Sequence, residues 1–243
     1  MLSNIDFPIA FTIIFTGTFL VGNIAFYLGS KKNWRSSSTR KFNHFGVSLI
    51  SIILFSFVPL EHTTITAIFT SLGILIIYII SANSKHSFIS SIMNSNIRDR
   101  DLPNGKFFVF LPLITGQVAL YFCLITMNPI LVKIAFCSMG FGDGLAEPIG
   151  TRYGKHTYQV KDFLWKKQNT KSLEGSAAVL LVSLLASFSL LYIYHFEGFM
   201  LTIAISIFYA LFITFIEAIS PRGLDNFLII LMGSLFLSFI VIT

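Results

Sequence analysis

The residues best suited to chemistry lie in one polar segment, which runs from Gly140 to Gly175. It combines carboxylates, cations and glycines, whereas the chain on either side is mostly apolar. Carboxylates can hold a divalent cation, cations can neutralise phosphate charge, and glycines let the backbone approach a ligand closely. These are the components of a nucleotide site. The residues are Asp143, Glu147, Glu174, Arg152, Lys155, Lys171, Gly140, Gly142, Gly144, Gly150, Gly154 and Gly175.

Two well-known phosphate-binding motifs do not explain this segment. A Walker loop needs Ser or Thr after its lysine, but His156 follows Lys155, and the spacing from Gly150 to Gly154 is one residue short. A dinucleotide fingerprint needs a βαβ unit around its glycines, and the apolar flanks do not predict one. The sequence therefore favours a phosphate site of another kind.

Three further polar clusters stand at the borders of apolar runs. They are residues 40–44 (Arg-Lys-Phe-Asn-His), Glu217, and residues 221–226 (Pro-Arg-Gly-Leu-Asp-Asn). Ionisable residues at a membrane edge are costly, so they mark function or pair with one another. Two structural alternatives stay open, because Asp225 could cap the helix that follows it and Glu217 could pair with Arg222.

Other charged residues have simpler interpretations. Asp143 could close a loop by pairing with Lys171 or Arg152, although its place at a membrane edge favours a function. The run 98–101 (Arg-Asp-Arg-Asp) is predicted to be a solvated surface whose charges compensate one another.

The composition excludes an ordinary soluble domain. Of the 243 residues, 54% are hydrophobic and 12% are charged, and the mean hydropathy is +0.78. Soluble domains carry about 25% charged residues. The apolar residues form long runs rather than a helical or strand period, as expected for helices surrounded by lipid. The net charge of +6 would suggest nucleic acid in a soluble protein, but here its placement indicates membrane topology, and no nucleic acid partner is expected.

The runs predict an all-α polytopic membrane protein. Each run is near the ~20 residues that cross a bilayer, although the second, fifth and eighth are short. We expect eight helices, or seven if the fifth run is re-entrant because lipid tolerates its glycine-rich end poorly. One membrane domain over residues 1–243 is expected, with residues 140–175 as its nucleotide-binding segment and cytoplasmic loop. The runs are 7–29, 45–60, 64–82, 107–127, 129–145, 175–194, 198–217 and 226–243.

The basic residues predict the orientation in the membrane. Every Lys and Arg except Lys133 lies in the first, third, fifth or seventh connection between the runs, and the even connections carry none. The positive-inside rule places these long loops in the cytoplasm and both termini outside. The candidate site then lies at the cytoplasmic face, and the expected location is a bacterial cytoplasmic (inner) membrane.

The polar segment resembles a known family. Asp143-x-x-Ala146-x-x-x-Gly150-x-x-x-Gly154, followed by Lys171-Ser172-x-Glu174-Gly175, is similar to the CTP-binding pattern of the dolichol kinase, phytol kinase and CTP-dependent diacylglycerol kinase group. Residues 40–44 and 224–226 resemble further features of phytol-kinase-like proteins. The gap between Gly154 and Lys171 is longer than the dolichol kinase pattern suggests, and Ser172 stands where that pattern often has Thr. These departures leave the substrate and the subfamily open.

The resemblance implies transfer of the γ-phosphate of CTP to the hydroxyl of a membrane lipid alcohol. Phytol, farnesol, a polyprenol such as dolichol, and diacylglycerol are all compatible acceptors. We expect Mg²⁺, or another divalent cation, on Asp143 and Glu174, with Asp143 and Lys171 catalytic and either Asp225 or His44 acting on the lipid hydroxyl. The expected nucleotide contacts are Gly142, Gly144, Ala146, Gly150, Arg152, Gly154, Lys155, Ser172, Glu174, Gly175, Arg40 and Asn226.

Three other functions use similar components. A lipid-phosphate cytidylyltransferase would form a CDP-lipid with the same CTP and Mg²⁺, and the residues alone do not separate it from a kinase. A CDP-alcohol phosphotransferase is disfavoured because Glu147 stands where its motif has Arg. A small membrane transporter is disfavoured because related halves and broken helices at the midplane are not visible in the sequence.

Overall fold

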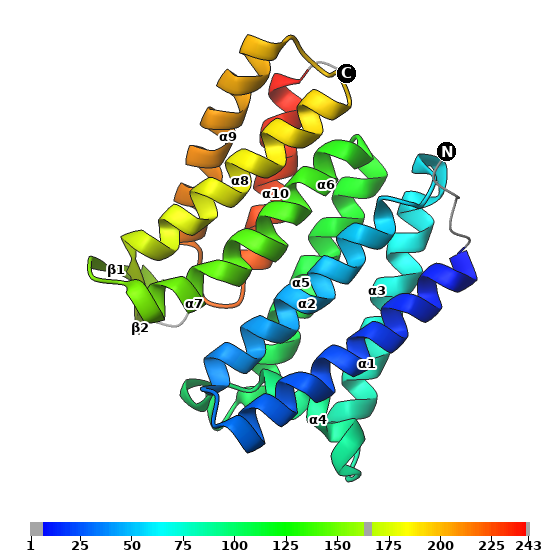
Figure 1. Cartoon of the computed structure of the whole chain (residues 1–243), viewed down its shortest axis with the longest axis vertical. Coiled ribbons are helices and arrows are strands. Elements are labelled where there is room, and N and C mark those ends of the chain that lie inside the picture. The colour runs from blue at the N-terminus through cyan, green and yellow to red at the C-terminus, as the bar shows by residue number, and fades with distance from the viewer. Residues whose placement is uncertain (1–6, 163–166, 242–243) are drawn as a thin grey trace. The chain divides into compact units, whose positions relative to one another are not determined.

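The computed structural model describes residues 7–162 and 167–241, and most of them are helical (Figure 1). The chain forms two compact units, Met1–Ile114 and Thr115–Thr243, and α5 (Gly105–Thr126) runs from the first into the second. The expected helical architecture is therefore confirmed. A single membrane domain over residues 1–243 stays a prediction.

Unit 1 is a bundle of apolar helices around α1. This helix contacts α2, α3 and α4, and α4 also contacts α2 and α3. Ile77, Ile92 and Val109 belong to a buried core cluster contributed by α3, α4 and α5. The polar connection between the third and fourth apolar runs is thus folded, because α4 buries Ile92 and Met93 together with three polar residues. The elements are α1 (Phe7–Lys32), α2 (Ser36–Phe55), α3 (Leu60–Asn83), α4 (Ser87–Asn96), η1 (Asp99–Asp101) and the first part of α5.

Unit 1 buries an ion cluster that the sequence analysis placed at the surface. Asp101 is 2% exposed and Arg98 is 6% exposed. The Oδ2 atom of Asp101 lies 2.9 Å from Arg98 Nε and 3.6 Å from Arg40 Nη1. The predicted solvated run is therefore wrong for Arg98 and Asp101, although Asp99 and Arg100 are exposed. A buried carboxylate needs such partners, because its desolvation is otherwise uncompensated.

Unit 2 contains the polar segment and most of the residues proposed for a site. Its first long helix is continuous from Pro129 to Tyr153, and a π-helical turn interrupts its regular α-helical pattern. Asn128 starts this helix by accepting a hydrogen bond from the Ile130 backbone N–H. The elements are the end of α5, α6 (Pro129–Cys137), η2 (Ser138–Asp143), α7 (Gly144–Tyr153), β1 (Thr157–Asp162), β2 (Lys167–Ser172), α8 (Leu173–Ile193), α9 (Phe199–Ile219) and α10 (Asp225–Ile240).

The glycine-rich part of the polar segment is helical rather than a loop, and its small residues pack α7 against α8. A Cβ atom added at Gly150 would lie 2.7 Å from Ser172 Oγ, and one at Gly175 would lie 2.7 Å from the Ala146 carbonyl oxygen. Small residues spaced four apart let two membrane helices approach closely. Glycine lowers helix propensity by about 1 kcal/mol per residue, so this packing must offset the cost. The expectation of a loop at this point is corrected accordingly.

The second half of the polar segment forms an antiparallel hairpin, which the expected all-α fold did not include. Thr157 pairs with Ser172 and Asp162 pairs with Lys167. Burial alternates along β1, as a strand with one covered face requires. Figure 1 shows the hairpin at the end of unit 2 where α8 begins and α9 ends. We call this the hairpin end of unit 2.

Six helices among the described residues are long and apolar enough to cross a membrane, which supports a multi-pass membrane protein. α2 begins with a polar stretch that includes Arg40 and Lys41, and α10 has 16 residues, so neither meets the same criteria. Eight spans therefore stay a prediction. The six are Pro8–Lys32, His62–Asn83, Gly105–Thr126, Pro129–Tyr153, Leu173–Ile193 and Phe199–Ile219.

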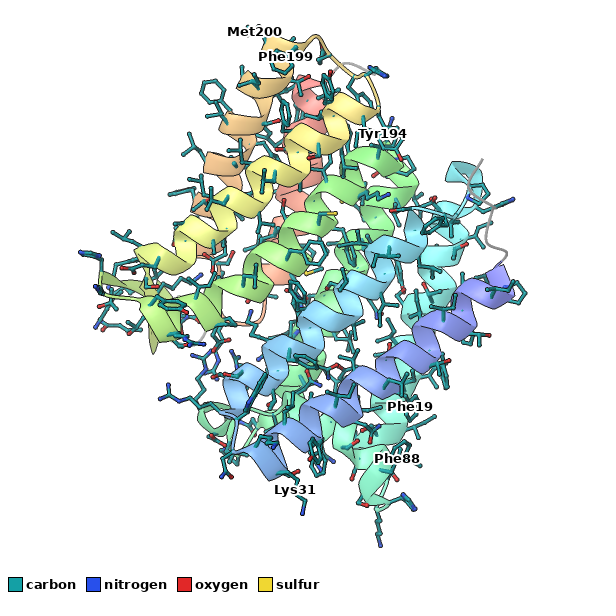
Figure 2. All side chains as sticks on the ribbon, viewed as in Figure 1. Phe19, Lys31, Phe88, Tyr194, Phe199 and Met200 are labelled. Atoms are coloured by element: carbon teal, nitrogen blue, oxygen red, sulfur yellow. The ribbon has the colours of Figure 1, made fainter. Side chains whose placement is uncertain are left out.

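The end of unit 2 opposite the hairpin exposes large apolar and aromatic side chains. Figure 2 shows Tyr194, Phe199 and Met200 there, and they are 45%, 52% and 77% exposed. Tyr192 contacts Phe199 with ring centroids 6.1 Å apart. Aromatic side chains at helix ends are typical of a membrane–water interface.

Labelling of single cysteines tests the predicted orientation. Lys85→Cys and Lys161→Cys should react with a membrane-impermeant thiol reagent only from the cytoplasmic side, because they lie in the basic connections. His62→Cys and Glu197→Cys should react only from the other side. The native Cys123 and Cys137 are buried, so background labelling of these two thiols should be low. Reaction of both pairs from one side would contradict the topology.

The α7–α8 contact predicts a large effect of one methyl group. A Cβ atom at Gly154 would lie 2.9 Å from the Cβ of Ser172, which caps α8, and would also meet the Gly150 carbonyl oxygen, so Gly154→Ala should destabilise unit 2 by about 1–3 kcal/mol. Gly198→Ala is the matched control, because nothing lies within 4 Å of its added Cβ. The measurement is the midpoint of thermal unfolding in detergent, which should fall by about 2–4 °C per kcal/mol. Equal midpoints for the two variants would contradict the packing.

Candidate functional site

A lysine–glutamate ion pair lies at the hairpin end of unit 2, and two further carboxylates act on it through longer-range charge. Lys171 Nζ is 2.6 Å from Glu217 Oε1, and Lys171 also donates to the backbone carbonyl of Glu217. Asp143 and Asp225 lie close enough to Glu217 for their charges to interact with it. We call Asp143, Lys171, Glu217 and Asp225 the acidic–lysine cluster. The structure thus brings together three residues expected to be catalytic and one membrane-edge carboxylate.

The hairpin places Lys171 in this cluster. Lys171 pairs with Tyr158 on the neighbouring strand, so the two side chains share one face of the hairpin. The Tyr158 hydroxyl lies 2.7 Å from Ser176 Oγ in the first turns of α8. This contact fixes the strand pair against α8, and the Lys171 side chain is only 21% exposed as a result.

Glu217 lies in the last turns of α9, and its side chain is 7% exposed. A carboxylate is unfavourable near a helix C-terminus, where the macrodipole is negative, and burial adds a desolvation cost. The contact with the Lys171 ammonium compensates both effects. Lys171 is a partner for Glu217 that the sequence analysis did not propose, since it considered only Arg222.

Asp143 stands at the end of the π-helical turn and is 6% exposed. Such turns are rare, and they occur frequently at functional sites because they redirect one side chain within an otherwise regular helix. The sequence analysis also allowed Asp143 to pair with Lys171. The main contact of the Lys171 ammonium is instead with Glu217. Asp143 therefore adds a second carboxylate to the neighbourhood of the ion pair.

Asp225 is placed by a tight turn between α9 and α10. The Leu224 N–H donates to the Pro221 carbonyl at 3.0 Å, and Gly223 has a φ of 85°. A positive φ at the third position of such a turn requires glycine. Asp225 is the first residue of α10 rather than its N-cap, which is Leu224. The Oδ1 atom of Asp225 accepts a hydrogen bond from the Asn226 backbone N–H at 3.0 Å, so the carboxylate satisfies one donor in the first turn of α10, where the helix dipole also favours it.

Glu174 makes contacts that differ from those expected of a metal ligand. Its Oε1 atom accepts hydrogen bonds from the backbone N–H groups of Lys155 (3.0 Å) and His156 (3.2 Å). The same oxygen lies 3.0 Å from His156 Nδ1. Glu174 therefore holds the connection between α7 and β1 onto the start of α8. Its pairing with Asp143 around Mg²⁺ stays a prediction, and the contacts described here do not join the two.

Several expected phosphate donors already have acceptors within the chain. Backbone N–H groups that bond inside a helix or a cap are not available to a ligand without rearrangement. Arg152 and Lys155, which were proposed for phosphate contacts, are both exposed. The Arg152 guanidinium lies 5.3 Å from the Tyr153 ring centroid. The occupied pairs are Gly144 N–H to Phe141 O, Gly154 N–H to Gly150 O, and Gly175 N–H to Ser172 Oγ.

Three other expected site residues have different surroundings. Asn226 is in the first turn of α10, and its Cβ would lie 3.2 Å from a Cβ added at Gly116 of α5. Arg40 and His44 belong to α2 in unit 1, where Arg40 contacts Asp101. Their participation with the acidic–lysine cluster stays a prediction.

The charge balance of the cluster suits a divalent cation with a polyphosphate. Among the four side chains, three are carboxylates and one is an ammonium group. The described residues contain no group of three or more His, Cys, Asp or Glu placed to hold a metal on their own. Mg²⁺ commonly binds through one or two carboxylates and completes its coordination with substrate phosphates and water. The donor set therefore fits Mg²⁺ as a partner of a nucleotide rather than as a caged ion.

Sequence reasoning missed Asp162, which is 3% exposed and lies on the covered face of the hairpin. Its carboxylate accepts hydrogen bonds from the Asn169 side chain and from the Arg222 backbone N–H. The alternation of Tyr158, Val160 and Asp162 was the available signal, because it has the period of a strand. That signal is short, and the surrounding glycines and charges obscure it.

The contacts of Glu174 predict a local effect of its removal. Glu174→Ala should raise amide hydrogen exchange of residues 155 and 156 at least tenfold, because both N–H groups lose their acceptor. Glu197→Ala is the matched control, since it removes a carboxylate from the opposite end of unit 2. Hydrogen exchange in detergent checks the result, and unchanged protection at residues 155 and 156 would contradict this role of Glu174.

Comparison with known proteins gives one significant relative among curated proteins. Phytol kinase of Synechocystis sp. is 35% identical to this chain over 99 residues. The match covers 40% of this chain and 39% of that protein, so it spans well under half of either. No family model matches the chain, and no solved structure matches it significantly. The distant similarity supports a relationship to phytol and polyprenol kinases without assigning a subfamily.

Proposed function

We propose that this protein is a membrane kinase that transfers the γ-phosphate of CTP to the hydroxyl of a lipid alcohol. The acceptor would be an isoprenoid alcohol such as phytol, farnesol or a polyprenol, or diacylglycerol. The observation that carries the proposal is the similarity to phytol kinase over 99 residues. The acidic–lysine cluster, at one end of helices able to cross a membrane, supplies suitable chemical groups. The reaction would take place at the cytoplasmic face of a bacterial inner membrane.

The proposed transfer needs positioning and charge neutralisation more than covalent chemistry from the protein. The alcohol oxygen would attack the γ-phosphorus, the bond from that phosphorus to the bridging oxygen would break, and CDP would leave. Asp143 would hold Mg²⁺ either with Glu174, as the sequence analysis expects, or with Glu217 or Asp225 of the acidic–lysine cluster, and the ion would neutralise phosphate charge. Lys171 would leave Glu217 for a phosphate oxygen, and its ammonium would stabilise the charge that develops there.

The remaining proposed roles are those that the sequence analysis gave to other charged residues and to the glycines. Arg152 and Lys155 are exposed cations that could contact the nucleotide phosphates. Asp225 or His44 would accept the proton of the lipid hydroxyl. The glycines that pack α7 against α8 would act indirectly, because they set the position of Asp143 relative to the start of α8.

The position of the label in CTP tests the proposal directly. Purified protein in mixed micelles would receive a panel of lipid alcohols and lipid phosphates, with CTP labelled at either the γ- or the α-phosphate. We expect label in a lipid alcohol only from the γ position. Asp143→Asn and Lys171→Met should each reduce the rate about 100-fold or more, because each removes a charge from the cluster.

Lys161→Met is the matched control, since Lys161 is exposed on the opposite face of the same hairpin. It should retain the wild-type rate. Label transferred from the α position would overturn the kinase and support a lipid-phosphate cytidylyltransferase. Absence of transfer from both labels, and also from ATP and GTP, would overturn both enzymes and favour a transporter. Size-exclusion chromatography in detergent would check that each variant is folded.

A further inference from the structure

One face of the hairpin is covered by the rest of unit 2, and the other face is exposed to solvent. Tyr158, Val160 and Asp162 alternate on β1 and are buried or half-buried, whereas the residues between them are exposed. Cross-strand pairing places Asn169 and Lys171 of β2 on the same covered face. Most of these residues are polar, so this face docks through directional hydrogen bonds rather than through apolar area.

Two of these contacts reach the region between α9 and α10. Lys171 contacts Glu217 before the turn, through the ion pair described above. Asp162 Oδ2 accepts a hydrogen bond from the Arg222 backbone N–H at 2.9 Å, within the turn itself. The hairpin thus holds this region at two points from two different strands.

Asp162 is itself held firmly. It is 3% exposed, and the same Oδ2 atom accepts a hydrogen bond from Asn169 Nδ2 at 3.1 Å. Asn169 lies opposite Val160 on the neighbouring strand, so the bond crosses the strand pair diagonally. A buried carboxylate with a fixed orientation is a rigid acceptor, and charge-assisted bonds of this kind are stronger than neutral ones.

The turn that Asp162 holds leads directly to the acidic–lysine cluster. Arg222 is the second residue of the turn, Gly223 is the third, and Asp225 begins α10 immediately afterwards. A shift of the Arg222 amide would therefore be transmitted to Asp225 across two residues. Lys171 would move with the hairpin to which Asp162 belongs.

We propose that Asp162 is a positioning residue of the phosphoryl-transfer site, which rests on the proposed function. It fixes the distance between the element that carries Lys171 and the element that carries Asp225. Asp162 touches neither the nucleotide nor the lipid in this role. It sets the relative placement of Lys171, whose ammonium would neutralise phosphate charge, and of Asp225, one of the two groups proposed to act on the hydroxyl. Misplacement of about 1 Å at such a site can cost about 100-fold in rate.

The test compares three variants of the full chain in detergent. Asp162→Ala removes the acceptor for Arg222, Asp162→Asn keeps a neutral acceptor oxygen, and Lys161→Ala changes the exposed neighbour. The first readout is hydrogen exchange of the Arg222 amide, which requires no enzymatic activity. The second readout is kcat and KM for the lipid alcohol, normalised to the amount of folded protein.

We expect Asp162→Ala to raise Arg222 exchange at least tenfold and to lower kcat at least tenfold, with KM for the lipid alcohol within twofold of wild type. Asp162→Asn should recover most of both losses, and Lys161→Ala should match wild type. Unchanged exchange in Asp162→Ala would overturn the positioning contact. Faster exchange with an unchanged kcat per folded molecule would also overturn the proposal, because Asp162 would then be structural only.

The two proposals fail in distinguishable ways. A wild-type protein that transfers no phosphate to any lipid alcohol refutes the proposed kinase, and with it the role of Asp162 in that reaction. The exchange measurement would still decide whether Asp162 holds the turn. An active wild-type protein with normal turnover in Asp162→Ala refutes only the positioning role.

Discussion

The ion pair between Lys171 and Glu217 is the interaction on which the hairpin end of unit 2 depends. Glu217 is buried near the C-terminus of α9, where both the low polarity and the helix dipole oppose a carboxylate. A cation must reach it, and α9 carries none in its last turn. The cation comes from β2, so the strand pair has to fold back against α8 and α9. This ion pair therefore attaches the hairpin to the end of α9.

A second constraint is the close approach of α7 and α8. Gly150 and Gly175 leave no room for side chains between these helices, and Ser172 both caps α8 and fills the remaining space. This contact fixes the start of α8 beside the end of α7. The π-helical turn that carries Asp143 also contacts α8. In the sequence these glycines suggest a phosphate-binding loop. In the structure they pack α7 against α8 and so help to place the carboxylates, and any direct contact with a nucleotide would be a second role.

The similarity to phytol kinase and the geometry of the cluster are both compatible with the proposed phosphoryl transfer. The similarity covers less than half of the chain, whereas the cluster collects side chains from four elements of unit 2. Phosphoryl transfer requires charge neutralisation at a fixed geometry, and a lysine among carboxylates at the end of apolar helices provides the groups for it. The proposed lipid substrate would suit this place, because its hydroxyl would lie at the polar surface of the membrane while its chain would remain among apolar helices.

The amino-acid sequence alone predicts the helical membrane class, because long apolar runs have few other solutions, and it identifies Asp143, Lys171 and Asp225 as residues of interest from their types and positions. Which of these residues contact one another depends on the three-dimensional packing. This packing buries Asp101, pairs Lys171 with Glu217, and gives Glu174 a role in holding a connection. Hydropathy reports the lipid environment of a long segment, which is a local property. Ion pairs, strand pairing and close glycine contacts depend on elements distant in the chain, so they follow from packing that no single segment encodes.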